Sequence, residues 1–262
     1  MKFLAVVQRE FQENVRNHKF IFLVMFIFGG ILMALYTEVG PTANSKNVLD
    51  PFFELFAILC PLIGIFSAMD SVVGEKEKGT LELVLSKPIS RTSLLFGKFV
   101  TYVLIIVPLL VAELVIAYYW AQFSGISTLR WHLDMPPFGQ WMSMVGIVTM
   151  VSMYYVALTI LISLFARSTA TAGLMGVVFM APAHPLGGEF LRIAGTMVGI
   201  TDFGQVPVLI RCVFSVFSKY QKFAMTSPLD AWICVISLLL LTAFLLFISG
   251  QIFNRQNITF RM

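Results

Sequence analysis

Six long apolar stretches separated by clusters of charged residues make up most of this 262-residue chain. A helix needs about 20 apolar residues to cross the ~30 Å hydrocarbon core of a bilayer, so stretches near that length predict membrane spans. The predicted spans cover residues 20–37, 51–69, 99–129, 135–166, 168–188 and 231–254. This pattern predicts an all-α, polytopic membrane protein with six transmembrane helices.

Two further segments complete the predicted architecture. Residues 1–19 carry apolar side chains at helical spacing among polar ones, which predicts an amphipathic helix along the inner membrane surface. The apolar positions are Leu4, Val7, Phe11 and Val15. Charges divide residues 189–230 into apolar pieces too short to span, which favours short interfacial or re-entrant helices on the outer side, between spans five and six. Residues 20–262 then form one six-span domain.

The composition excludes a soluble protein. Apolar residues make up 58% of the chain and charged residues 12%, so too few charges are present to cover a water-exposed surface. A net charge of +4 is too small to indicate a nucleic-acid partner. The cysteines, Cys60, Cys212 and Cys234, match neither a disulfide framework nor a metal-binding spacing. We therefore expect them to be packing residues, and we expect no metal site.

The distribution of basic residues predicts the orientation of the chain. Most of the 18 lysines and arginines lie before the first span, between spans two and three, or after the last span. Because positively charged loops remain in the cytoplasm, these segments are predicted to be cytoplasmic. We expect a multi-pass protein of the plasma membrane with both termini in the cytoplasm.

The segment between spans two and three, residues 70–98, concentrates much of the charge and carries signals for the end of one helix and for a short second one. Gly79 can end a helix that extends below the membrane, and Thr80 can cap a second helix. Pro88 then stops the second helix. A short, partly apolar helix held below the bilayer is typical of a docking element.

The third span has start signals of its own. Ser90 is suited to cap its first turn, because a serine hydroxyl can accept a hydrogen bond from a free amide there. Arg91 and Lys98 are expected at the lipid headgroups, where basic side chains anchor the ends of spans.

Residues 75–98, EKEKGTLELVLSKPISRTSLLFGK, resemble the signature of permease subunits of ABC transporters of the ABC-2 class, particularly the NosY-like branch. In that family a similar pattern joins spans two and three. The sequence FNRQNI at residues 253–258 resembles the family's F-x-R-x-D-I ending, although Asn257 replaces the usual aspartate. The resemblance extends to the amphipathic start, the six spans and the long outer segment, and so covers most of the chain.

The resemblance implies a permease subunit that couples ATP hydrolysis by a separate cytoplasmic ATPase to export of a substrate. A coupling segment, residues 70–93, would contain a helix that inserts into that ATPase. Implied partners are two ATPase copies carrying ATP and Mg, a second copy of this chain or a homologous permease, membrane lipid, and a candidate extracytoplasmic accessory protein. The residues implied to lie at or support the ATPase contact are Glu75, Glu77, Gly79, Thr80, Leu81, Glu82, Leu83, Ser86, Pro88 and Arg91.

The chain is expected to have no ATP site of its own. Residues 74–80, GEKEKGT, superficially resemble a phosphate-binding loop, but the lysine after the second glycine is missing and no strand precedes them. Glu75 and Glu77 would also repel phosphate. Because no other catalytic motif occurs, we expect neither enzyme activity nor a bound cofactor in this chain.

Two carboxylates lie inside otherwise apolar spans, Glu54 in the second and Glu113 in the third. A charge at mid-bilayer costs about 2.5–3.5 kcal/mol, so each should face the bundle interior, pair or be protonated. Both are candidates for the translocation pathway. Alternatively, Glu54 lies at the outer interface near Asp50, and Glu113 makes a structural hydrogen bond to a neighbouring helix.

Two other classes of function stay open from the residues alone. An ATP-independent channel or secondary carrier predicts inverted repeats, and no convincing internal repeat is found. A membrane assembly scaffold or lipid-acting enzyme would need acid, base or metal-binding side chains facing one aqueous site, and Glu54 and Glu113 alone are insufficient.

Overall fold

The computed structural model of the chain describes residues 2–16, 25, 28–29, 49–81, 90–123, 138–180 and 228–255. All the regular structure in these ranges is helical, which confirms the all-α fold class. The main helices are α1 (Lys2–Arg16), α3 (Leu49–Ala68), α4 (Val73–Glu77), α6 (Arg91–Phe123), α8 (Phe138–Phe165), α9 (Thr169–Met180) and α13 (Pro228–Arg255).

Among the described residues, four helical stretches are long and apolar enough to cross a membrane, and they correspond to predicted spans two, three, four and six. They are Ile58–Glu77, Arg91–Tyr119, Trp141–Phe165 and Val235–Arg255. The fifth predicted span is described only over the shorter apolar helix α9. The first predicted span and the outer segment 189–230 lie almost entirely outside the described residues. The total of six spans therefore stays a prediction.

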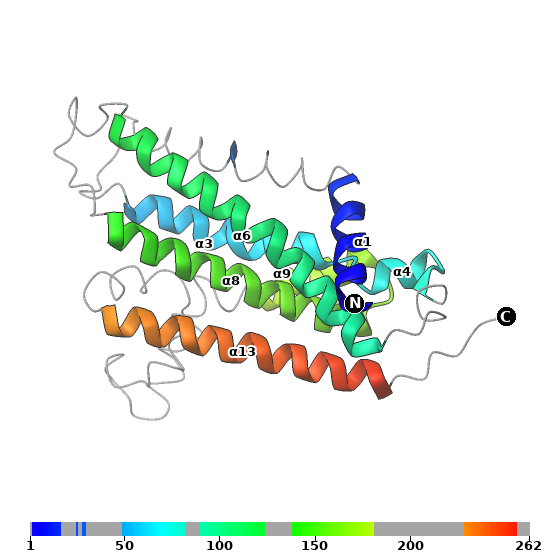
Figure 1. Cartoon of the computed structure of the whole chain (residues 1–262). Helices are drawn as coiled ribbons and strands as arrows, with labels where there is room; N and C mark the ends of the chain where they lie inside the picture. Colours follow the sequence, from blue (N-terminus) through cyan, green and yellow to red (C-terminus); the bar gives the residue numbers. More distant parts are fainter. Residues whose placement is uncertain are drawn as a thin grey trace, which may run out of the picture.

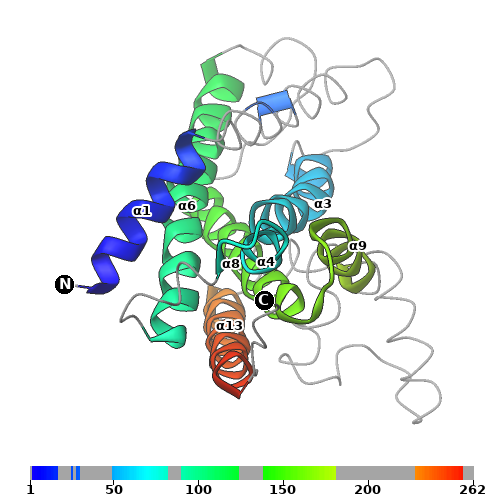
Figure 2. The same cartoon turned by 90° about the vertical axis from the view of Figure 1, so that its right-hand side faces the viewer.

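Helix α8 lies at the centre of the helical bundle. It contacts α3, α6, α9 and α13, and the view along the bundle in Figure 2 shows these helices arranged around it. Helix α1 packs across the outside of α6, and it lies at the same end of the bundle as α4 and the end of α13 (Figure 1). The cytoplasmic position of both termini and of the coupling segment stays a prediction.

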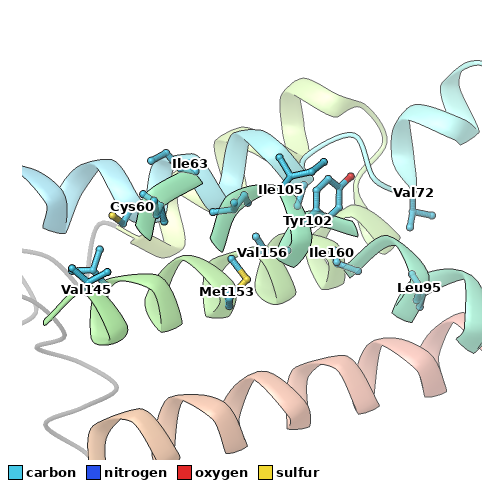
Figure 3. Packing of buried hydrophobic residues seen from close by; sticks show 14 of the residues in the cluster. Cys60, Ile63, Val72, Leu95, Tyr102, Ile105, Val145, Met153, Val156 and Ile160 are labelled. Atoms are coloured by element: carbon cyan, nitrogen blue, oxygen red, sulfur yellow. The ribbon is translucent and has the colours of Figure 1, made fainter. Parts of the chain in front are cut away.

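The core lies where α3, α6 and α8 meet (Figure 3). Cys60 is fully buried there, as expected for a packing residue, and its backbone carbonyl accepts a 3.0 Å hydrogen bond from the Ser152 hydroxyl. Gly64, one turn later on α3, lies so close to α8 that an added Cβ would come within 2.6 Å of the Ser152 carbonyl oxygen. The absent side chain of Gly64 thus sets how closely these two helices approach.

We predict that Gly64→Ala destabilises the protein by about 1–3 kcal/mol, because the added methyl group would push α3 away from α8. Thermal unfolding in detergent would measure the effect. Gly146→Ala is the matched control, since a Cβ at Gly146 would meet nothing within 4 Å. Equal melting temperatures for the two variants would show that the helix approach does not depend on Gly64.

Candidate functional site

The described parts of the coupling segment are residues 70–81, which include α4 and the turn that follows it, and residues 90–93 at the start of α6. Helix α4 lies at one end of the bundle (Figure 1). Six of the ten residues implied in the ATPase contact are described: Glu75, Glu77, Gly79, Thr80, Leu81 and Arg91. The other four, Glu82, Leu83, Ser86 and Pro88, lie outside the described residues.

Gly79 ends α4, as the sequence predicts. Its φ of +66° is in the left-handed region that glycine adopts without strain. The Gly79 amide donates to the Lys76 carbonyl at 3.2 Å and the Thr80 amide donates to the Glu75 carbonyl at 3.0 Å, which is the Schellman pattern of a helix C-terminus. The turn exposes Glu77, Lys78 and Gly79, and the chain then re-enters the protein at buried Leu81.

Three consecutive charged residues of α4 each contact a different helix. Glu75 Oε1 accepts a 2.9 Å hydrogen bond from Lys98 Nζ on α6. Lys76 Nζ donates to the carbonyl of Leu164 near the end of α8, at 2.8 Å. Glu77 Oε1 accepts a 3.2 Å bond from the Thr169 amide at the start of α9.

The signs of these contacts suit the helix ends. The last carbonyls of a helix and its first amides lack partners within the helix, and they attract cations and anions respectively. Lys76 lies at the carbonyl end of α8, and Glu77 lies at the amide end of α9. Helix α4 therefore binds directly to the neighbouring ends of α8 and α9.

Lys98 connects α4 to the N-terminal helix as well. Its Nζ lies 2.9 Å from Glu75 Oε1 and 2.9 Å from Glu10 Oε2, so one ammonium binds two carboxylates. We call Glu10, Lys98 and Glu75 the ion triad. The Lys98 side chain is only 3% exposed, and removing one partner from a buried ion pair typically costs about 3–5 kcal/mol. The expectation that Lys98 lies at the lipid headgroups is therefore wrong.

Sequence reasoning also missed Glu10. Of the apolar residues predicted to form one stripe on residues 1–19, Leu4, Phe11 and Val15 are exposed in the protein, whereas Val7 is buried. The side of α1 that packs on the protein carries Val7 together with Val6 and Glu10. The sequence feature that could have indicated the buried position of Glu10 is its place one helical turn after Val6, on a face next to the predicted apolar stripe.

Arg91 joins the start of α6 to the end of α13. Its guanidinium donates a 3.1 Å hydrogen bond to the Phe253 carbonyl and lies 5.8 Å from the centre of the Phe253 ring. The two segments that carry the family resemblance thus meet in space. Beside Arg91, the Ser90 hydroxyl accepts a 3.2 Å bond from the Ser93 amide, which confirms the predicted cap.

Of the two carboxylates predicted inside membrane spans, the structure describes the side chain of Glu113 but not that of Glu54. Glu54 lies on α3, but its side chain is outside the described part of the structure. The Glu113 side chain on α6 is mostly buried, and its Oε2 has no hydrogen-bond partner among the described residues. Within those residues, no group of three or more His, Cys, Asp and Glu side chains is arranged to hold a metal ion.

The sequence is similar to a known protein family and to two named proteins. A family model described as "ABC-2 family transporter protein" matches residues 4–258. A Pseudomonas aeruginosa protein named "Probable ABC transporter permease protein NosY" is 28% identical over 209 residues, covering 76% of this chain and 65% of the relative. A Stutzerimonas stutzeri protein of the same name is 29% identical over 108 residues, covering 38% of each chain. The chain thus matches slightly less than two thirds of the first relative's length.

We predict that Arg91→Ala lowers stability by about 1–3 kcal/mol, because it removes a charged hydrogen bond and a cation–π contact between α6 and α13. Thermal unfolding in detergent tests this. Arg255→Ala, at an exposed position of α13, is the control and should change stability little. An Arg91→Ala protein as stable as the control would mean that this contact does not hold the two helices together.

Proposed function

The chain belongs to the ABC-2 family of transporter proteins, and we propose that it is the permease subunit of an ABC transporter that works with a separate cytoplasmic ATPase. The observation that carries the proposal is the coupling segment, in which an exposed turn at one end of the bundle is tied by α4 to three other helices. A partner that moves this turn would move the ends of α6, α8 and α9.

The proposed cycle begins at the coupling segment. Two copies of the ATPase bind ATP and Mg and close on each other, which displaces the segment 70–93 of each permease. Because α4 is bonded to the helix ends, the displacement shifts the bundle between two arrangements. A second copy of this chain, or a homologous permease, completes the pathway, and the substrate leaves the cell across the plasma membrane.

The contact residues divide into two groups within this proposal. Glu77 and Gly79 are exposed on the turn, where the ATPase can reach them, although Glu77 also accepts the hydrogen bond from the Thr169 amide of α9. Glu75 and Arg91 are partly buried in contacts with Lys98 and Phe253. Glu75 and Arg91 then support the contact from inside the permease. The segment 82–89 supplies the rest of the docking surface.

Glu113 is the side chain we propose for the translocation pathway, together with Glu54. A carboxylate in an apolar span with an unpartnered oxygen is typical of a functional site rather than of a structural hydrogen bond. Cationic groups of a substrate are the chemistry that such a carboxylate would bind.

The ATPase contact predicts a partner that one substitution removes. Affinity capture of the detergent-solubilised chain from its native membrane, followed by mass spectrometry, should recover an ABC ATPase. Leu83→Glu should reduce the recovery about tenfold or more, because it places an unpaired charge in a docking surface. Gln12→Glu, which adds the same charge at an exposed position of α1, should not reduce it.

Recovery of the ATPase in equal amounts with Leu83→Glu would contradict the position of the contact. Recovery of no nucleotide-binding partner with the unmodified chain would contradict the permease role and favour an ATP-independent carrier or a scaffold.

Glu113→Gln should lower transport, measured as rescue of the growth or resistance phenotype of a strain lacking the gene, while leaving the amount of captured ATPase unchanged. The substitution removes the negative charge but keeps the size of the side chain. Full rescue by Glu113→Gln would remove Glu113 from the pathway.

A further inference from the structure

The ion triad joins three elements that are far apart in the sequence. Glu10 lies on α1, Glu75 lies on α4 and Lys98 lies near the start of α6. The two carboxylates meet through the Lys98 ammonium, which is 2.9 Å from each. Lys98 belongs to α6, a helix long enough to span the membrane. The triad therefore attaches both α1 and α4 to the same residue of α6.

Hydrogen bonds and packing next to the triad set the position of α1 on α6. The Thr101 hydroxyl lies 3.3 Å from the Val7 carbonyl and 2.9 Å from the Gly97 carbonyl, so it lies between the two helices. Val6 and Val7 are buried on the same side of α1 as Glu10. These contacts accompany the register in which Glu10 faces Lys98.

The residue types indicate a role beyond stability. A buried ion pair is often no more stabilising than well-packed apolar side chains of the same size, and its best-attested use is to fix register. Lys98 also reaches its partners through a flexible four-carbon stem with three donor hydrogens, so it can follow small shifts without losing either carboxylate. Such a contact keeps α1 and α4 together while the helices tilt.

We propose that Lys98 is a positioning residue that makes α1 move with the coupling segment as one body during the transport cycle. The inference rests on the proposed function, since the motion it describes is driven by the ATPase. It goes beyond that function by making the interfacial helix part of the moving unit rather than a passive membrane anchor. Glu10, which has no contact role in the docking surface, then affects the ATPase reaction.

The first arm of the test measures the connection in the chain alone by hydrogen exchange in detergent. Lys98→Met should raise amide exchange in residues 2–16 and in residues 73–81 together, because both segments lose the same anchor. Glu13→Gln changes an exposed carboxylate on α1 and should leave both segments as in the unmodified protein. Unchanged exchange in residues 2–16 of the Lys98→Met protein would overturn the proposal.

The second arm measures ATP hydrolysis per captured ATPase in the purified complex. Glu10→Gln should lower this rate severalfold without reducing the amount of ATPase captured, whereas Glu13→Gln should change neither. The double variant Glu10→Gln/Lys98→Met should lose no more activity than Lys98→Met alone, because both substitutions break the same connection. A normal rate with Glu10→Gln, or losses that add, would overturn the proposal.

The variant Lys98→Arg separates a failure of folding from a failure of the proposal, because it keeps the positive charge between Glu10 and Glu75. It should fold and should recover part of the hydrolysis rate that Lys98→Met loses. If no ATPase is captured with the unmodified chain, the proposed function fails, and the hydrogen-exchange arm still decides whether the triad joins α1 to α4.

Discussion

A buried lysine ammonium shared by two carboxylates fixes how one end of this bundle is assembled. Lys98 holds Glu10 and Glu75 at hydrogen-bonding distance in an environment where an unpaired charge would be costly. The position of α1 across α6 and the position of α4 below the bundle therefore depend on each other.

Helix ends supply the remaining contacts. Lys76 binds a carbonyl near the end of α8, Glu77 binds an amide at the start of α9, and Arg91 binds a carbonyl near the end of α13. Charged side chains thus satisfy backbone groups that would otherwise lack partners where the helices stop. Within the EKEKG sequence, Glu75, Lys76 and Glu77 therefore bind other helices of the protein, while Glu77, Lys78 and Gly79 are exposed on the turn.

Local signals made some features predictable. Long apolar runs located the four candidate membrane helices among the described residues, and Gly79 and Ser90 marked a helix end and a helix start correctly, because each effect depends on neighbouring residues. The ion triad joins Glu10 to Lys98 across 88 residues, so no local pattern contains it. Lys98 was expected among lipid headgroups because most lysines at span ends extend there. A contact between distant elements overrode that tendency.

The central claim is that the exposed turn after α4 faces an ABC ATPase. A photo-crosslinking amino acid placed at Lys78, which is exposed, tests this claim in native membranes. The account predicts a single major adduct that contains an ABC ATPase and that is absent when the same amino acid replaces Gln12 on α1. An adduct with another protein, or with lipid alone, would contradict it.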